Sequence, residues 1–187
     1  MAPRRPPDIL RKSHAHTEGK ARARSKRDLL DELTQSEATG APAAVLLIGL
    51  AGVIYDGDRA IPGASDAIAW LRRHAIKHFF ISDPSFTSPV AAAQALQALG
   101  LPVREQEILE SSDVAVAAES AWVISDDIRT GIANAQEAGL KGILVKTGRF
   151  RAGDLGLGIE PALVLDSIAD LPAHWGTNDL HTRRDSG

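Results

Sequence analysis

A short apolar run, Val45 to Ile48, constrains the fold of this chain most, because its four apolar residues follow one another without alternation. Such a run is typical of a central parallel strand that is covered on both faces, whereas a strand facing water on one side alternates. Gly49 and Gly52 follow at once. Glycine permits a sharp turn or the close approach of a ligand, and ligands of open α/β sheets bind at the carboxyl ends of strands. The sequence therefore predicts a functional site directly after this run.

Four further apolar runs of strand type follow along the chain, each bounded by turn residues. They fall at 78–82, 121–125, 142–145 and 161–165. Segments with helical spacing separate them, which implies a mostly parallel sheet with right-handed crossovers. We predict an α/β fold, a three-layer Rossmann-like domain over residues 43–175.

The predicted helices carry clear start and stop signals. Gly63 to Ala75 has apolar residues at helical spacing, and 127–138 has the same spacing before Gly139. Ser88 and Pro89 have the residue types of an N-cap and a first helical position, and a glycine ends that helix at position 100. The turn-rich segment 55–62 is expected to form a loop or small hairpin over the end of the first strand.

The two ends of the chain differ in composition from this body. Residues 1–27 hold 9 Lys and Arg and 2 Asp and Glu, a net charge of +7, so the remaining residues carry −10. We expect residues 1–42 to be a basic, largely disordered tail with a short helix near 25–36, and residues 176–187 to be frayed. The tail's charge suits an acidic surface, nucleic acid or the body itself, but residues 1–54 contain no aromatic side chain for stacking on bases.

Two absences in the composition narrow the class of protein. The chain has no Cys, which excludes disulfides, thiolate nucleophiles and Cys-ligated zinc, and we expect a cytoplasmic location. Its apolar stretches are far shorter than the roughly 20 residues of a membrane helix, so no membrane segment is expected.

Adjacent acids follow the predicted strand at 121–125. Asp126 and Asp127 would lie at the same edge of the sheet as Ser82, which ends another predicted strand. Carboxylates in such a place suit Mg²⁺, which takes one or two of them together with waters and phosphate. The alternative is that one acid only caps the helix that follows, because helix N-termini favour acidic residues. The spacing leaves both interpretations open.

Several blocks of the sequence resemble one enzyme superfamily. They are LLIGLAGVIYDGDRAIPGA (46–64), FISD (80–83), ISDDIRTGIANAQEAGLKGILVKTGRF (124–150) and PALVLDSIADLP (161–172). Together they resemble the haloacid dehalogenase-like superfamily, in the branch of phospholysine phosphohistidine inorganic pyrophosphate phosphatase. The resemblance implies phosphoryl transfer to an aspartate at the end of the first strand, with Mg²⁺ and a Lys neutralising the negative charge.

Carried over by position, the resemblance assigns a role to each candidate residue. The nucleophile position is Gly49 and the second acid position is Ala51, so neither supplies a carboxylate. Ser82 and the loop at Gly52 would bind the phosphoryl group. The pair at positions 126 and 127 would hold Mg²⁺.

Other parts of the family pattern are absent from the chain. The acid expected four residues after Asp127 is Gly131, and no Lys lies between Ser82 and Asp126. Only about forty residues separate Ser82 from Ile124, too few for the cap domain of such relatives, so we expect no cap.

These departures favour an inactive protein that serves as a binding or assembly module, with a protein partner or a second copy covering the uncapped edge. Two alternatives stay open. One is a weakly active Mg²⁺-dependent phosphohydrolase that uses the acidic pair, with Mg²⁺ bound weakly. The other is a passive phosphate or nucleotide pocket.

Overall fold

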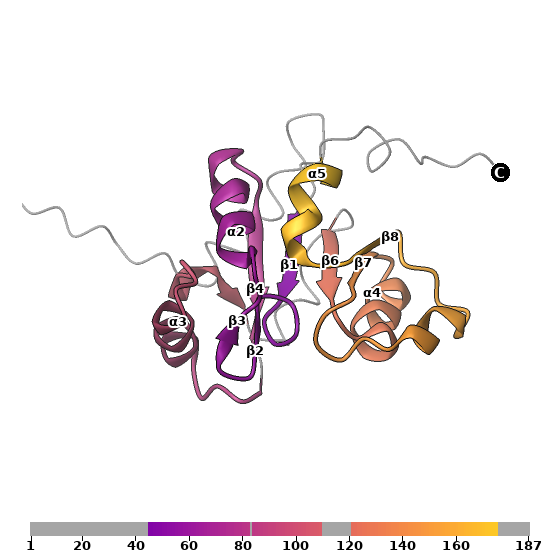
Figure 1. Ribbon diagram of the computed structural model, residues 1–187, viewed down its shortest axis with the longest axis horizontal. Coiled ribbons are helices and arrows are strands. Elements are labelled where there is room, and N and C mark those ends of the chain that lie inside the picture. Colours follow the sequence, from indigo (N-terminus) through magenta and orange to yellow (C-terminus); the bar gives the residue numbers. More distant parts are fainter. Residues whose placement is uncertain (1–44, 83, 110–120, 176–187) are drawn as a thin grey trace, which may run out of the picture.

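The computed structural model describes residues 45–82, 84–109 and 121–175 (Figure 1). The expectations for the tail over residues 1–42, for its short helix and for residues 176–187 concern residues outside these ranges. Among the helices that are described, none is long and apolar enough to cross a membrane.

The described residues are organised around a six-stranded sheet in the order β5-β4-β1-β6-β7-β8, and every pair of neighbours is parallel. The α/β, Rossmann-like prediction is confirmed. The strands are β1 (Val45–Gly49), β4 (His78–Ile81), β5 (Ile108–Leu109), β6 (Ala121–Ser125), β7 (Lys141–Val145) and β8 (Leu163–Leu165).

Strand β1 lies inside the sheet between β4 and β6, with Ile48 opposite both Phe80 and Ile124. Its residues from Val45 to Ile48 are at most 1% exposed, because apolar side chains cover both faces. The continuous apolar run therefore predicted its position correctly.

Helices cover both faces of the sheet. Helices α2, α3 and α5 pack into the larger apolar core, which contains Leu46 and Ile48 of β1. Helix α4 packs on the other face with Val45 and Leu47, and it lies at the opposite end of the molecule from α3 (Figure 1). The α-helices are α2 (Ala64–Arg73), α3 (Pro89–Ala98), α4 (Ala133–Glu137) and α5 (Leu171–Trp175).

Helix α3 begins and ends as its sequence predicts. The Ser88 side chain accepts a hydrogen bond from the N–H of Ala91, and Pro89 occupies the first helical position. Gly100 follows the C-cap with φ of 78°, a left-handed conformation that glycine adopts without strain.

The predicted helix over 127–138 is not one regular α-helix. It starts as a π-helical turn, η4 (Ile128–Ile132), and continues as α4. The N–H groups of Gly131 and Ile132 both point to the carbonyl of Asp127, at 2.9 and 3.0 Å. Residue spacing cannot separate these two helix types over a single turn, which explains the difference.

Several short elements of the described residues complete or correct the prediction. Strand β5 is not among the strands predicted from the sequence, because two residues are too few to display a strand pattern. The last strand starts at Leu163 rather than at 161. The remaining short helices are η2 (Glu105–Glu107), η5 (Ala152–Gly156) and η6 (Ile168–Asp170).

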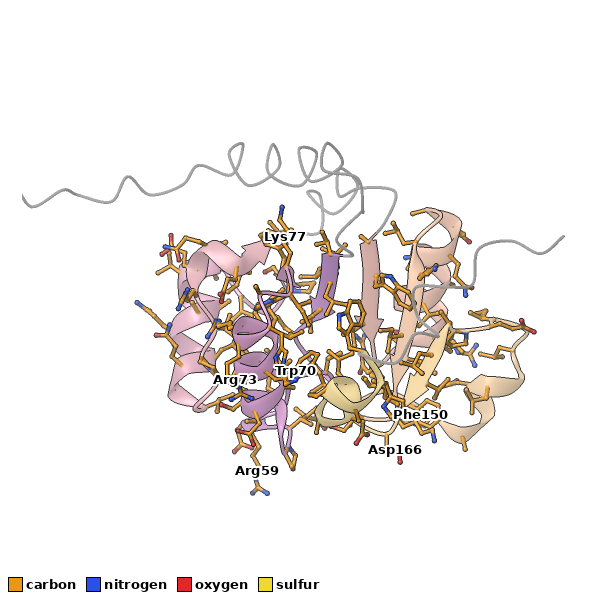
Figure 2. All side chains as sticks on the ribbon, turned by 90° about the horizontal axis from the view of Figure 1, so that it is seen from above. Arg59, Trp70, Arg73, Lys77, Phe150 and Asp166 are labelled. Atoms are coloured by element: carbon orange, nitrogen blue, oxygen red, sulfur yellow. The ribbon has the colours of Figure 1, made fainter. Side chains whose placement is uncertain are left out.

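The turn-rich segment after β1 forms a two-stranded hairpin of β2 (Tyr55–Asp56) and β3 (Arg59–Ala60), one of the two predicted possibilities. Its Arg59 side chain is 88% exposed and points away from the body (Figure 2). No residue of the hairpin lines the pocket described next.

Candidate functional site

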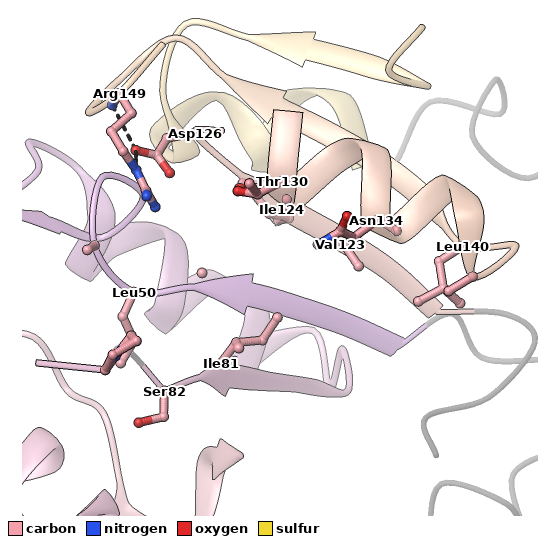
Figure 3. A pocket seen from close by; sticks show the side chains of 17 residues that line it. Leu50, Ile81, Ser82, Val123, Ile124, Asp126, Thr130, Asn134, Leu140 and Arg149 are labelled. Carbon is pink, nitrogen blue, oxygen red and sulfur yellow. Dashed lines mark hydrogen bonds and ion pairs between the residues drawn. The ribbon is translucent and has the colours of Figure 1, made fainter. Parts of the chain in front are cut away.

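A pocket of about 410 Å³ opens where β1, β4 and β6 end (Figure 3). It runs from these strand ends along one face of the sheet toward Leu140, just before β7. Its wall is mostly apolar, and its polar groups lie mainly at the strand ends and on the η4–α4 segment. The lining residues that carry the argument are Gly49, Ala51, Ser82, Asp126, Thr130 and Arg149.

The β1 side of the pocket supplies no polar side chain, because Gly49, Leu50 and Ala51 line it. Gly49 ends the strand and Ala51 follows in the loop. The φ of Gly49 is not positive, so its backbone would accept a side chain. A Cβ built there would lie 3.2 Å from the Ile124 carbonyl oxygen and 3.2 Å from Cγ2 of Val53. These neighbours would have to move by a few tenths of an ångström to admit a residue larger than glycine.

Asp126, at the end of β6, is the most deeply buried charged residue in the described part of the chain, with 2% of its surface exposed. Its Oδ2 accepts a hydrogen bond of 2.8 Å from the backbone N–H of Arg149. The Nε of the Arg149 guanidinium lies 3.5 Å from the same oxygen. A buried carboxylate needs such compensation, and here a single residue after β7 supplies it.

Asp127 caps the helix that follows it. Its Oδ1 accepts hydrogen bonds from the N–H groups of Arg129, at 2.9 Å, and Thr130, at 3.1 Å. Burial alone would raise the pKa of Asp127. Hydrogen bonds from the Thr130 hydroxyl and these two N–H groups, with the charge of Arg149, outweigh burial and hold that pKa below its usual value. The helix-cap interpretation thus applies to the second acid of the pair.

One guanidinium bridges the two acids. Nη1 of Arg149 lies 3.6 Å from Oδ2 of Asp127, while its Nε faces Asp126. Figure 3 shows this side chain reaching from the β7 loop toward Asp126, at the end of the pocket far from Leu140. The Arg149 side chain is 66% exposed, so solvent reaches the cation while Asp126 stays covered.

Glycines close the other sides of Asp126. A Cβ added at Gly52 or at Gly148 would collide with Oδ2 of Asp126, and both glycines have positive φ, 74° and 55°. The N–H of Gly52 donates to the Tyr55 carbonyl at 2.7 Å, and its own carbonyl accepts from the Thr147 hydroxyl at 2.5 Å. Gly52 therefore lies behind Asp126 with its N–H already bonded, rather than at the pocket surface where a phosphate would bind.

Ser82 lines the pocket on the opposite side of β1 from Asp126. Its N–H donates to the Leu109 carbonyl at 2.7 Å, which fixes the backbone after β4. In Figure 3 its hydroxyl points away from Asp126. The structure thus brings Ser82 and Asp126 to one pocket, but it does not direct them at a single point, and Asp127 does not line the pocket.

Two lysines on and just after β7, Lys141 and Lys146, do not line the pocket. Lys146 pairs with Asp166 at 2.9 Å, and Lys141 lies over the Trp122 ring, 4.9 Å from its centre. Among the described residues that line the pocket, Arg149 is the one with a cationic side chain.

The acidic pair fits a magnesium ion poorly. Mg²⁺ needs oxygen ligands at about 2.0–2.1 Å and keeps several waters in an octahedral arrangement. Oδ2 of Asp126 is enclosed by two glycines and Arg149, and Oδ1 of Asp127 is used by the helix cap. Over the described ranges no group of three His, Cys, Asp or Glu side chains lies close enough together to hold a metal.

Arg149 is the residue of the pocket that sequence reasoning missed. A usable signal was present, because the residue follows Thr147 and Gly148 at the end of a strand that pairs with β6. A basic residue there lies beside acids that end the neighbouring strand. The family pattern does not predict a role for Arg149, because it places its cationic residue, a Lys, before Asp126.

Comparison with known proteins places these features in a family. One family model, described as haloacid dehalogenase-like hydrolase, matches residues 46–121, and a second, described as HAD-hydrolase-like, matches residues 87–171. A segment of 36 residues is 53% identical to haloacid dehalogenase-like hydrolase domain-containing protein 2 of Bos taurus. That segment spans 19% of this chain and 14% of the relative's length.

Solved structures share the fold at low sequence identity. A hypothetical protein of Pyrococcus horikoshii aligns with a TM-score of 0.62 and 15% identity, over 71% of this chain and 99% of the other. A glycerol phosphate phosphatase of Mycobacterium tuberculosis, solved in complex with magnesium, aligns with a TM-score of 0.58 and 13% identity, over 68% of this chain and 76% of the other. The consecutive family matches over the parallel sheet lead to one conclusion: this chain belongs to the haloacid dehalogenase-like hydrolase superfamily.

Proposed function

We propose that this chain is a catalytically inactive member of its superfamily that acts as a binding or assembly module. The observation that carries the proposal is Gly49. The family pattern expects an attacking aspartate at this position, and the residue ends β1 at the pocket without any side chain. A covalent phosphoryl intermediate needs a nucleophilic atom there, and neither Gly49 nor Ala51 has one.

The expected loss of catalytic rate is large enough to support the proposal of inactivity. Removing a nucleophile from an enzyme that forms a covalent intermediate costs on the order of 10⁴- to 10⁶-fold in rate. The arrangement of two candidate groups supports the proposal, since Ser82 points away from the acids and Arg149 lies between them. We therefore propose a pocket that binds a partner group without reacting with it.

The alternative of a weak Mg²⁺-dependent phosphohydrolase is less well supported. It would need Asp126 or Asp127 to hold a metal-bound water, but both carboxylates already contact Arg149. The magnesium in the mycobacterial phosphatase belongs to that protein. For this chain we propose weak Mg²⁺ binding at most.

A passive phosphate or nucleotide pocket is also less favoured. The strand-end region carries two carboxylates and one guanidinium, a net charge of −1, which repels a phosphate dianion unless a metal ion joins it. The mostly apolar wall better suits an apolar group of a partner. We propose that a protein partner or a second copy of the chain covers this edge.

The absence of a cap domain is part of the same proposal. Residues 84–109, which lie in the described part of the chain after Ser82, contain α3, η2 and β5, and these elements contribute to the apolar core and the sheet. The segment therefore adds to the sheet instead of standing over the pocket. An uncapped pocket is open to a macromolecular partner.

Turnover assays test the proposal. p-Nitrophenyl phosphate, pyrophosphate and phosphoamidates are incubated with the wild-type protein and excess Mg²⁺, and we expect no turnover above background. Gly49→Asp restores the family carboxylate, and Gly49→Ala is its matched control because it adds the same Cβ without the acid. Circular dichroism must show that both variants are folded.

Turnover by the wild-type protein that Asp126→Asn abolishes would contradict inactivity and support the phosphohydrolase alternative. Activity in Gly49→Asp but not in Gly49→Ala would locate the missing function at this one position. Calorimetry with phosphate and nucleotides at millimolar concentration tests the passive-pocket alternative. That alternative predicts measurable heat of binding, and the absence of heat would contradict it.

A further inference from the structure

We propose that Arg149 occupies the place of a divalent cation, so that the acidic pair of this chain is stabilised by a built-in guanidinium and excludes Mg²⁺. This goes beyond the proposed function, because it concerns the counter-ion of Asp126 and Asp127 and not turnover. The juxtaposition of one exposed Arg with two adjacent acids at the strand ends carries the inference.

The first argument is charge compensation. Asp126 is 2% exposed, and its Oδ2 contacts Arg149 twice, through the backbone N–H at 2.8 Å and through Nε at 3.5 Å. A buried carboxylate without a cation is strongly unfavourable. The guanidinium therefore does what a bound metal ion would otherwise do for this oxygen.

The second argument is that one cation serves both acids. A divalent ion bound by adjacent carboxylates would lie between an oxygen of each, and Arg149 presents Nε to Asp126 and Nη1 to Asp127. The planar guanidinium is suited to such bridging because its nitrogen donors are held in a fixed fork. Lysine, with a single nitrogen, could not reach both acids in the same way.

The third argument is space. Backbone atoms of Gly52 and Gly148 close on Oδ2 of Asp126, and Arg149 fills the remaining approach. Mg²⁺ would have to bring its waters into the volume that the guanidinium holds. The positions that could have added carboxylates around an ion are Gly49, Ala51 and Gly131, and a side chain at Gly131 would collide with Oγ of Ser125.

The test measures cation binding directly. Mg²⁺ is titrated calorimetrically into wild type, Arg149→Ala and Arg149→Gln, and thermal unfolding is followed with Mg²⁺ or with NaCl at equal ionic strength. Wild type should bind no more tightly than millimolar and keep its Tm. Both variants should melt lower than wild type without Mg²⁺, and they should bind it at least about tenfold more tightly than wild type, since two uncompensated carboxylates attract a divalent ion.

Arg129→Gln is the matched control. Arg129 has the same 66% exposure, pairs with one carboxylate, Asp154, at 3.6 Å, and has its guanidinium outside the pocket lining. Its removal changes the net charge equally and should leave the Mg²⁺ response as in wild type. A gain in Mg²⁺ affinity equal to that of the Arg149 variants would mean that net charge alone attracts the ion, and it would overturn the proposal.

Two further results would overturn the proposal. One is submillimolar Mg²⁺ binding by the wild type. The other is an affinity for Mg²⁺ in the folded Arg149→Gln protein that equals that of the wild type. This variant also tests the proposal if Arg149→Ala does not fold. Wild-type phosphatase activity without divalent ions would instead contradict the proposed function and leave this inference standing.

Discussion

The two sides of the pocket carry different kinds of residue. On the β1 side, Gly49 and Ala51 offer no functional group, whereas on the β6–β7 side Asp126 and Arg149 are charged and paired. Arg149 also pairs with Asp127, which lies beside the pocket. The charged side chains also have structural tasks. Asp127 caps η4, and Asp126 ties the end of β6 to the loop after β7.

This contrast indicates why acidic residues at the positions of a family motif are weak evidence for catalytic activity. A residue at the end of β1 that served only as nucleophile can be replaced by glycine at the cost of activity alone. Residues that also hold loops together cannot be replaced without a loss of stability. The acids on the β6 side are therefore explained by the fold, whether or not a metal ion ever binds them.

The largest effect on stability is expected from substitution of Gly52, which lies against Asp126. Gly52→Ala should destabilise the protein by about 3 kcal/mol or more, because it adds a collision with Oδ2 of Asp126 to the strain of a positive φ. Gly57→Ala is the matched control, since Gly57 has φ of 57° and no atoms within 4 Å of an added Cβ. The control should lose only about 1–2 kcal/mol from backbone strain. Equal losses in urea unfolding would show that Asp126 is not tightly enclosed.

A smaller effect separates the two acids. Asp126→Asn should cost about 2 kcal/mol, because it removes the charge that faces Arg149 inside the protein. Asp127→Asn should cost less than about 0.5 kcal/mol, because asparagine caps a helix nearly as well and the lost ion pair is partly exposed. Denaturant unfolding of both variants measures the difference. The reverse order would mean that the helix cap, not the buried contact with Arg149, is the main structural role of the pair.

The smallest effect is a pH dependence that belongs to Asp127. Its pKa is lower in the folded state than its ordinary value of 3.8, so the unfolded chain takes up this proton first as the pH falls. The stabilisation is complete above about pH 5 and decreases as the pH falls through 3.8 toward the folded-state pKa. Unfolding of wild type and Asp127→Asn at pH 3 to 7 should give curves that converge at low pH. A constant difference across this range would mean that the charge of Asp127 contributes nothing.

The fold was largely predictable because its strands are continuous apolar runs and its helices have clear ends. The run at 45–48 indicated the central strand, and Ser88, Pro89 and Gly100 marked helix α3. The two-residue strand β5 and the π-helical turn η4 were not predictable, since neither is long enough to impose a period.

The candidate site was predictable in its location but not in its contacts. The rule that parallel strands end at one edge correctly brought Gly49, Ser82 and Asp126 to one pocket. The role of Arg149 depends on the pairing of β7 with β6 and on the two glycines that close on Asp126. Neither follows from residue spacing, because both depend on tertiary contacts between distant segments.

The position of β1 inside the sheet has a consequence for how the chain is made. One edge of β1 pairs with β4, which follows soon after it in the sequence, with Leu46 opposite His78. The other edge pairs with β6, which starts at Ala121. During synthesis one edge of β1 therefore keeps its backbone N–H and C=O groups unpaired until β6 has left the ribosome. A ribosome-bound chain that ends before residue 121 should accordingly be prone to aggregate or to recruit chaperones, and one long enough to expose β6 and β7 outside the ribosome should not.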